Sequence, residues 1–179
     1  MDALTQAAAR GDADAMEEVV RMHYSAVYRF CARRVGPELA QDVAQETFLT
    51  AYKQLFNFDG RSAFVTWLLG IAHNHCRNYA RKRRPETSFC DDWTQMDVMD
   101  NRNREDAENN LVDREALRCA LRSLSPEHRE VVLLHEVEGH TYEEAAVIIG
   151  VPVGTVKSRL YHAFLRLRAT LAGVEEVKA

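Results

Sequence analysis

Apolar side chains recur every three to four positions through most of this chain of 179 residues, which is the period of an amphipathic helix. No stretch shows the strict alternation that a half-buried strand needs. The breaks coincide with glycine and proline, as at Gly36-Pro37, where proline suits the first turn of the next helix. Ser125 before Pro126 has the form of an N-cap with proline in the first turn. The pattern therefore predicts an all-α fold, with helices at about residues 12–34, 37–56, 62–84, 111–124, 126–137, 142–149 and 153–171.

Charge is distributed unevenly along the chain. The net charge of −4 and the pI near 6.0 disfavour a protein that binds DNA tightly alone, because neutralising phosphates supplies most non-specific affinity. Residues 1–84 carry a net +3 and residues 113–179 a net −1, whereas residues 85–112 carry a net −6. We expect such a protein to depend on a basic partner when it holds nucleic acid.

The acidic stretch also lacks sustained periodicity. We expect residues 86–111 to form a flexible acidic linker between two small helical domains, residues 1–85 and residues 112–179. The alternative is a buried helix that uses three apolar side chains of this segment, Phe89, Trp93 and Met96.

Cysteine usage and the N-terminal sequence bear on the compartment. The four cysteines, Cys31, Cys76, Cys90 and Cys119, form no CxxC pair and suggest no disulfide framework. The N-terminal residues have neither the basic start nor the apolar run of a signal peptide, and charges interrupt every apolar stretch before membrane-spanning length. We therefore expect a cytoplasmic protein.

The clearest local signal is the segment 139–168, GHTYEEAAVIIGVPVGTVKSRLYHAFLRLR. Thr141 and Glu144 have the spacing of a capping box, which would open a short helix. The sequence Gly150–Pro152 then predicts a tight turn into a second helix. A short helix, a turn of this size and a second helix are the parts of a helix-turn-helix.

The second helix of this pair has two different faces. Its apolar stripe predicts a buried side that consists of Val153, Val156, Leu160, Phe164, Leu167 and Leu171. The outward side carries hydrogen-bond donors for phosphates and base edges, namely Thr155, Lys157, Ser158, Arg159, Tyr161, His162 and Arg166. The alternative is an ordinary solvated face, and Leu165, which also points outward, does not fit the DNA-reading interpretation.

The helix at 62–84, which Ser62 is expected to cap, ends in the basic run Arg81–Arg84. Aromatic surfaces and cations suit single-stranded DNA, whose bases stack and whose backbone needs neutralising. The candidates on this helix are Phe64, Trp67, Asn74, Arg77, Asn78 and Tyr79. Phe64 and Trp67 have the alternative of a place in the core, which we favour for Trp67 because its neighbours continue an apolar stripe.

The preceding helix carries the sequence DVAQETFLTAY. Asp42, Gln45 and Glu46 fall on one side of it, with Phe48 and Tyr52 near the boundary. A carboxylate pair can serve acid–base chemistry, but no histidine, cysteine or glycine-rich loop joins it at matching spacing. A protein-docking face is therefore the better interpretation.

These stretches together resemble the extracytoplasmic-function (ECF) type of bacterial sigma factor. The matching pieces, in the family's order and spacing, are DVAQETFLTAY, FDGRSAFVTWLLGIAHN with the basic run after it, LSPEHREVVLLHEVEGHTYEEAAVIIG and VPVGTVKSRLYHAFLRLR. The resemblance implies a promoter-melting N-terminal domain and a C-terminal domain for the upstream promoter element. It also implies an initiation factor that binds core RNA polymerase and directs promoter-specific transcription, without catalytic residues, cofactor or metal.

The resemblance assigns partners to particular residues. Those that would dock on the clamp helices of the largest polymerase subunit are Asp42, Gln45, Glu46 and Phe48. Those that would hold the melted minus-ten element are Phe58, Asp59, Arg61, Ser62, Phe64, Asn74, Arg77, Asn78 and Arg81. Those that would enter the major groove of duplex DNA at the minus-thirty-five element are Thr155, Lys157, Ser158, Arg159, Tyr161, His162 and Arg166.

The resemblance further implies an anti-sigma factor as a partner, a monomer when the protein is free, and no membrane contact except through that partner. His73 and His162 stand where the family often has arginine. A neutral imidazole makes weaker contacts than a guanidinium and none that are bidentate. The promoter sequence therefore cannot be inferred from relatives.

Two other functions fit parts of the sequence. One is a regulator that binds duplex DNA by itself, which leaves the basic, aromatic-rich helix of the first domain unexplained. The other is a metal enzyme or metal sensor built on one of two groups, His73, His75 and Cys76 or His128, His135 and His140. Neither an HExxH nor a CxxC motif supports a metal site, and His73 and His75 point in different directions on a helix, so we expect packing or surface roles.

Overall fold

The computed structural model describes residues 3–83 and 117–177, and within these ranges every regular element is a helix. The chain divides into two compact units, Met1–Asp92 with Ala146–Gly150 and Trp93–Ala145 with Val151–Ala179. The predicted all-α fold with two domains is confirmed. The predicted linker at residues 86–111, and the buried helix considered as its alternative, lie outside the described residues.

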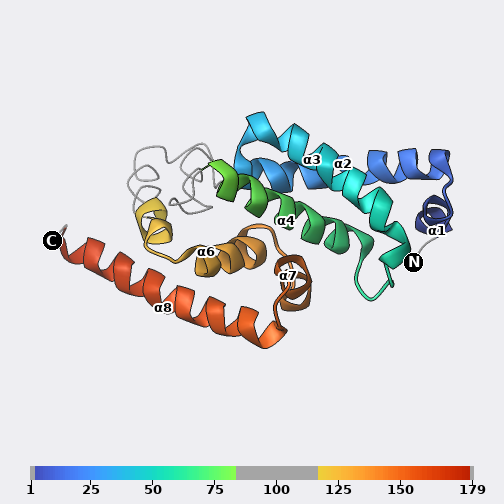
Figure 1. Cartoon of the computed structure of the whole chain (residues 1–179). Helices are drawn as coiled ribbons and strands as arrows, with labels where there is room; N and C mark the ends of the chain where they lie inside the picture. The colour runs from blue at the N-terminus through green and yellow to red at the C-terminus, as the bar shows by residue number, and fades with distance from the viewer. Residues whose placement is uncertain (1–2, 84–116, 178–179) are drawn as a thin grey trace, which may run out of the picture. The chain divides into compact units, whose positions relative to one another are not determined.

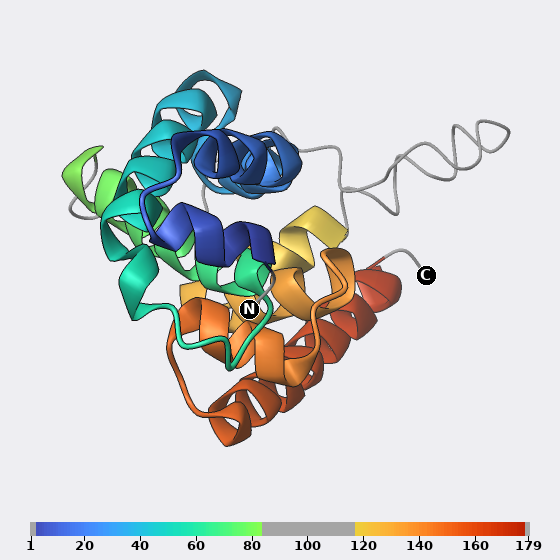
Figure 2. The ribbon, with the colours of Figure 1, turned by 90° about the vertical axis from the view of Figure 1, so that its right-hand side faces the viewer.

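The first unit is built around three long helices that pack against one another (Figure 1). Its elements are α1 (Ala3–Ala9), α2 (Ala13–Val35), α3 (Pro37–Gln54), the 3-10 helix η1 (Leu55–Asn57) and α4 (Phe64–Arg83). The short α1 contacts α2 and η1, and it lies across this group in the view of Figure 2. α1 is not predicted by the apolar pattern, because its run of alanines and polar residues has no clear apolar stripe.

The start of α2 and its junction with α3 follow from local chemistry. Asp12 caps α2, because its side chain accepts a hydrogen bond of 3.0 Å from the amide of Ala15. Gly36 ends α2 with a φ of +80°, a conformation that glycine adopts without steric cost. Pro37 then begins α3 at once, as the sequence predicts.

The cap of α4 differs from the prediction. The amide of Trp67 donates to the carbonyl of Ala63 at 3.2 Å, which places Ala63 rather than Ser62 at the N-cap position. Apolar packing accounts for this start of α4. The helix begins at Phe64, whose ring is buried among neighbouring aromatic rings. The expectation that Ser62 caps this helix was therefore wrong by one residue.

The described part of the second unit begins with a helical stretch at residues 117–122. The elements after it along the chain are α6 (Pro126–Val132), the π-helix η3 (Leu133–Val137), α7 (Tyr142–Ile149), whose residues from Ala146 onward are assigned to the first unit, and α8 (Val153–Val177). Ser125 caps α6 through a hydrogen bond of 3.3 Å from the amide of His128, as the sequence predicts. α8 continues beyond its predicted end at residue 171.

The apolar stripe of α8 has a slightly different phase from the prediction. Val156, Leu160 and Ala163 are buried, whereas Phe164, which we expected in the core, is 46% exposed. A helix turns about 100° per residue, so a core contact at Ala163 turns Phe164 towards the edge of the stripe. Leu165 is exposed, as the sequence indicated.

Arg129 of α6 closes the end of the helical stretch at 117–122. Its Nε donates to the carbonyl of Leu121 at 2.9 Å, and its Nη2 donates to the carbonyls of Arg122 at 3.2 Å and Leu124 at 3.0 Å. Carbonyls at the end of a helix have no partner within that helix. The buried guanidinium therefore satisfies them and fixes this end against α6.

We predict that Arg129→Met lowers the free energy of unfolding of the second unit by about 2–4 kcal/mol, because buried carbonyls lose their donor. Urea denaturation followed by circular dichroism measures the loss, and amide hydrogen exchange locates it at residues 117–124. Arg168→Met, which removes an exposed arginine of α8, serves as the control. Equal stabilities of the two variants would contradict the role of Arg129.

Candidate protein and nucleic-acid interfaces

The exposed side of α3 combines polar and apolar residues. Asp42, Gln45 and Glu46 are all exposed, as a docking face requires. The same side continues with three large apolar side chains, Leu49 (55% exposed), Tyr52 (53%) and Phe56 of η1 (76%). The core side of α3 consists of Ala40, Val43, Ala44, Thr47, Phe48 and Ala51. Polar and apolar groups thus form one continuous surface along α3.

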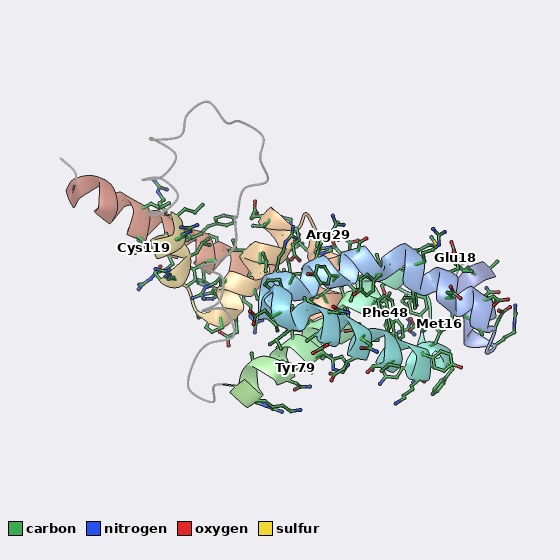
Figure 3. The ribbon with its side chains drawn as sticks, turned by 90° about the horizontal axis from the view of Figure 1, so that it is seen from above. Met16, Glu18, Arg29, Phe48, Tyr79 and Cys119 are labelled. Carbon is green, nitrogen blue, oxygen red and sulfur yellow. The ribbon has the colours of Figure 1, made fainter. Side chains whose placement is uncertain are left out.

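Phe48 is the exception among the predicted docking residues. Phe48, which is labelled in Figure 3, is only 7% exposed. Its ring stacks on that of Tyr24 of α2 with centroids 6.3 Å apart. The side chain packs between α2 and α3, beneath the exposed side of α3. The exposed apolar residue is its neighbour Leu49, which sequence reasoning missed although it follows Asp42 and Gln45 at helical spacing.

Aromatic rings pack beneath the turn between η1 and α4. The centroids of Phe58, Phe64 and Trp67 are 5.3–5.5 Å apart, and His23 of α2 lies 5.4 Å from Phe64. Phe58 and Phe64, which the resemblance assigns to the minus-ten element, are buried in the free protein. Trp67 packs on both rings but is only half-buried, so it belongs to the core in part. These packed rings lie beneath the turn and stabilise its conformation.

The turn itself presents polar groups. Asp59 Oδ1 accepts a hydrogen bond of 3.0 Å from the amide of Arg61. Asp59 Oδ2 forms an ion pair with Arg61 Nε at 3.1 Å. Gly60 between them has a φ of +73°. Asp59 and Arg61 are exposed and Ser62 is half-buried, so the three predicted polar residues of this turn lie at the surface.

The outer side of α4 is polar and basic. Four predicted DNA-contacting residues are exposed on it, Asn74, Arg77, Asn78 and Arg81, and Lys82 is exposed beside them. The amides can donate to and accept from base edges, and the cations can neutralise phosphates. His73, by contrast, is buried, so it belongs to the interior of the unit.

Glu46 of α3 binds two residues of α4. The hydroxyl of Tyr79 donates to Glu46 Oε1 at 3.1 Å, and His75 Nδ1 lies 3.4 Å from Glu46 Oε2. His75 Nε2 is 2.9 Å from the hydroxyl of Thr50, one turn further along α3. The hydrogen bond to Glu46, together with partial burial and the negative charges of Glu46 and Asp42, raises the pKa of Tyr79.

The predicted capping box at the start of α7 is present in full. The amide of Glu144 donates to the hydroxyl of Thr141 at 3.1 Å, and the amide of Thr141 donates to Glu144 Oε2 at 2.9 Å. Gly150 follows α7 with a φ of +68°. Pro152 then accepts from the amides of Thr155 and Val156 at 2.9 and 3.3 Å, which starts α8. The order helix, three-residue turn, helix is that of a helix-turn-helix.

The outward face of α8 has the composition that the sequence predicts. Lys157, Ser158, Tyr161, His162 and Arg166 are exposed, and Thr155 and Arg159 are half-buried. Lys157 Nζ lies 5.4 Å from the ring centroid of Tyr142. The ring of Tyr142 also stacks on that of His135, with centroids 4.4 Å apart. A cation over an aromatic face loses part of its freedom, so Lys157 is partly preorganised.

The histidines that raised the question of a metal site have protein partners. His75 is bound between Glu46 and Thr50, and His135 Nδ1 is 2.8 Å from the carbonyl of His140. Over residues 3–83 and 117–177, no three histidine, cysteine or acidic side chains are grouped so as to hold a metal ion. None of the helices described above is long and apolar enough to cross a membrane.

Comparison with known proteins bears on both units. Residues 19–86 match the family described as sigma-70 region 2, and residues 114–167 match the family described as sigma-70, region 4. An ECF RNA polymerase sigma-E factor of Haemophilus influenzae is 35% identical over 169 residues, which cover 90% of this chain and 89% of that protein. The ECF RNA polymerase sigma-E factor of Escherichia coli K12 is 34% identical over 174 residues, covering 89% and 88%. The chain belongs to the ECF RNA polymerase sigma factors.

Solved structures agree with this family. CnrH, in complex with the cytosolic domain of CnrY, is 25% identical to this ECF sigma factor with a TM-score of 0.63, covering 98% of this chain and 97% of that chain. The sigma factor RpoE of Bartonella quintana, in complex with the anti-sigma factor NepR, is 27% identical with a TM-score of 0.59, covering 87% and 96%. In this ECF sigma factor the region 2 match includes α3 and α4, and the region 4 match includes α7 and the outward face of α8.

The pKa of Tyr79 provides a direct test of the Glu46 contact. Folding favours the neutral phenol, so this stabilisation is present below the ordinary pKa of about 10 and is lost as the pH rises through the raised pKa of the folded protein. We predict that Glu46→Gln lowers the pKa of Tyr79. The measurement is a titration of tyrosinate absorbance in the wild type and in Glu46→Gln. Subtracting the titration of the same protein with Tyr79→Phe added isolates the absorbance of Tyr79 in each background. Identical titrations of Tyr79 in both backgrounds would contradict the hydrogen bond.

Proposed function

We propose that this ECF sigma factor divides promoter recognition between α4 with its preceding turn, which hold the melted minus-ten element, and α8, which reads the minus-thirty-five duplex, while α3 docks on core RNA polymerase. The observation that carries the proposal is that each unit exposes one polar, donor-rich face on a single long helix. Family membership supplies the polymerase as the common partner.

The polymerase surface in this proposal is the exposed side of α3. Asp42 and Gln45 would form its polar part, and Leu49 and Tyr52 its apolar part. Interfaces of this kind derive most of their energy from a few apolar or aromatic anchors surrounded by polar groups. Glu46 lies at the edge of this surface, because both its carboxylate oxygens face α4. The partner would be the clamp helices of the largest subunit.

The minus-ten surface would consist of the turn before α4 and the outer side of α4. Its members are Asp59, Arg61, Ser62, Asn74, Arg77, Asn78 and Arg81. Taking a base out of the duplex costs a few kcal/mol, which hydrogen bonds to its exposed edge and phosphate neutralisation can offset. The packed rings of Phe58, Phe64 and Trp67 would keep the turn in place while it does so.

The minus-thirty-five surface would be the outward face of α8, with Thr155, Lys157, Ser158, Arg159, Tyr161, His162 and Arg166. A helix enters the major groove and distinguishes base pairs by their donors and acceptors there. This second contact fixes the register of the promoter without touching the melted bases. Two contacts on one chain also raise the effective concentration of each, which compensates for the acidic net charge.

The protein would contribute binding energy to initiation and no catalytic group, and it would need neither a cofactor nor a metal. It would act in the cytoplasm, where the polymerase is, and it would be monomeric when free. An anti-sigma factor is the expected regulator, since the solved sigma factor RpoE is in complex with the anti-sigma factor NepR. Any membrane contact would come through that factor.

For the α8 surface, we predict that replacing Lys157, Ser158 and Tyr161 together by alanine abolishes promoter-specific transcription and leaves polymerase binding intact. Each good contact to a base pair discriminates by about 1–3 kcal/mol, so three losses exceed a hundredfold. Run-off transcription measures the first activity and a pull-down with core polymerase the second. Arg168→Ala, another charge loss on α8, is the matched control. Loss of polymerase binding in the triple variant would refute the assignment.

For the α3 surface, we predict the reverse behaviour. Asp42→Ala and Leu49→Ala should each weaken polymerase binding about tenfold or more, because the centre of an interface carries most of its energy. At saturating concentration the assembled enzyme should keep its promoter preference. Met22→Ala removes an equally exposed apolar side chain from α2 and should have no effect. Unchanged polymerase affinity in both α3 variants would place the docking surface elsewhere.

A further inference from the structure

Four side chains form a link between α3 and α4. Glu46 and Thr50 lie one turn apart on α3, and His75 and Tyr79 lie one turn apart on α4. Tyr79 bonds to Glu46, and His75 lies between Glu46 and Thr50, at the distances given above. We refer to these four residues as the α3–α4 link.

Both carboxylate oxygens of Glu46 take part in the link. One carboxylate oxygen accepts from the phenol and the other faces the imidazole, whose second nitrogen is bonded to the hydroxyl of Thr50. A carboxylate held in this way is directed at α4, although its side chain is 47% exposed. Glu46 therefore differs from Asp42, which shares its side of the helix and acts on Tyr79 only through its charge, whereas Glu46 also accepts a hydrogen bond from the Tyr79 hydroxyl.

The link matters because of what lies beside it on α4. Asn74 precedes His75, Asn78 precedes Tyr79, and both asparagines are exposed on the proposed minus-ten surface. Side-chain ends lie about 5–6 Å from the axis of a helix, so a rotation of roughly 20° moves them by about 2 Å. Misplacement by about 1 Å is enough to weaken a positioned contact. Fixing the rotation of α4 therefore fixes where the asparagines meet a base.

We propose that Glu46 is a positioning residue for promoter opening, which acts through Tyr79 and His75 by holding α4 in the orientation that presents Asn74 and Asn78 to the melted strand. This inference rests on the proposed minus-ten role of α4. It assigns to Glu46 a function different from polymerase docking, although it belongs to the docking motif.

The test separates polymerase binding from opening. The variants Tyr79→Phe, which removes one hydroxyl, Glu46→Gln and their combination are assembled with core polymerase at saturating concentration on a linear promoter. Polymerase affinity is measured by fluorescence titration, and initial promoter binding and the opening rate are separated by varying enzyme concentration. Tyr28→Phe, which removes a hydroxyl from α2, is the matched control.

The proposal expects each single variant to open the promoter about five- to tenfold more slowly, with polymerase affinity and initial binding unchanged. The double variant should be no slower than the singles, because both break the same interaction. Weaker polymerase binding by Glu46→Gln together with a silent Tyr79→Phe would overturn it, since Glu46 would then be a docking contact. Equal losses in affinity and opening in Tyr79→Phe would also overturn it, by indicating a general defect of the fold.

The same experiment distinguishes failure of this inference from failure of the proposed function. If the wild-type protein gave core polymerase no start-site selectivity, the proposed function itself would fall. If the wild type is selective and both single variants open the promoter at the wild-type rate, only the role of the α3–α4 link is refuted.

Discussion

The phase of the buried stripe on each helix determines which residues remain free for function. On α3 the core takes Val43, Ala44 and Thr47, which leaves Asp42, Gln45 and Leu49 on the opposite side. Because each residue advances the helix by about 100°, a stripe displaced by one position exchanges a core residue for a surface one. Burial of apolar area provides the energy that sets this phase, and the functional faces are its consequence.

Sequence reasoning succeeded where a signal is local. The Thr141–Glu144 capping box, the cap at Ser125 and the start at Pro37 each depend on residues within one turn, so their chemistry is legible without the fold. It did not determine whether Phe48, Phe58 and Phe64 are buried. Their burial depends on which rings of other segments approach them, and an aromatic residue in a functional motif serves equally well as a contact or as support.

The contacts between α3 and α4 could not be predicted from the sequence, for a related reason. Glu46 and Tyr79 are 33 residues apart, and Thr50 and His75 are 25 apart, so neither pair has a periodic or spacing signal. Glu46 and Asp42 look equivalent in the motif because they share a helix face. Only the packing of a second helix distinguishes them, by supplying a donor to one carboxylate. A motif therefore identifies a face, whereas tertiary contacts assign the individual roles on it.

The acidic net charge of the chain bears on how strongly it can bind DNA. A chain with a net charge of −4 gains little from DNA at long range, so in the proposed function its affinity for DNA would arise at the two local faces on α4 and α8. Each face alone offers only a few cations, which is too few for tight binding at cellular salt. Docking of α3 on core polymerase, as proposed, would remove this weakness by raising the local concentration of promoter DNA around both faces. Weak intrinsic affinity would then be a condition for selectivity, because it would keep the free protein from occupying promoters without the enzyme that must use them.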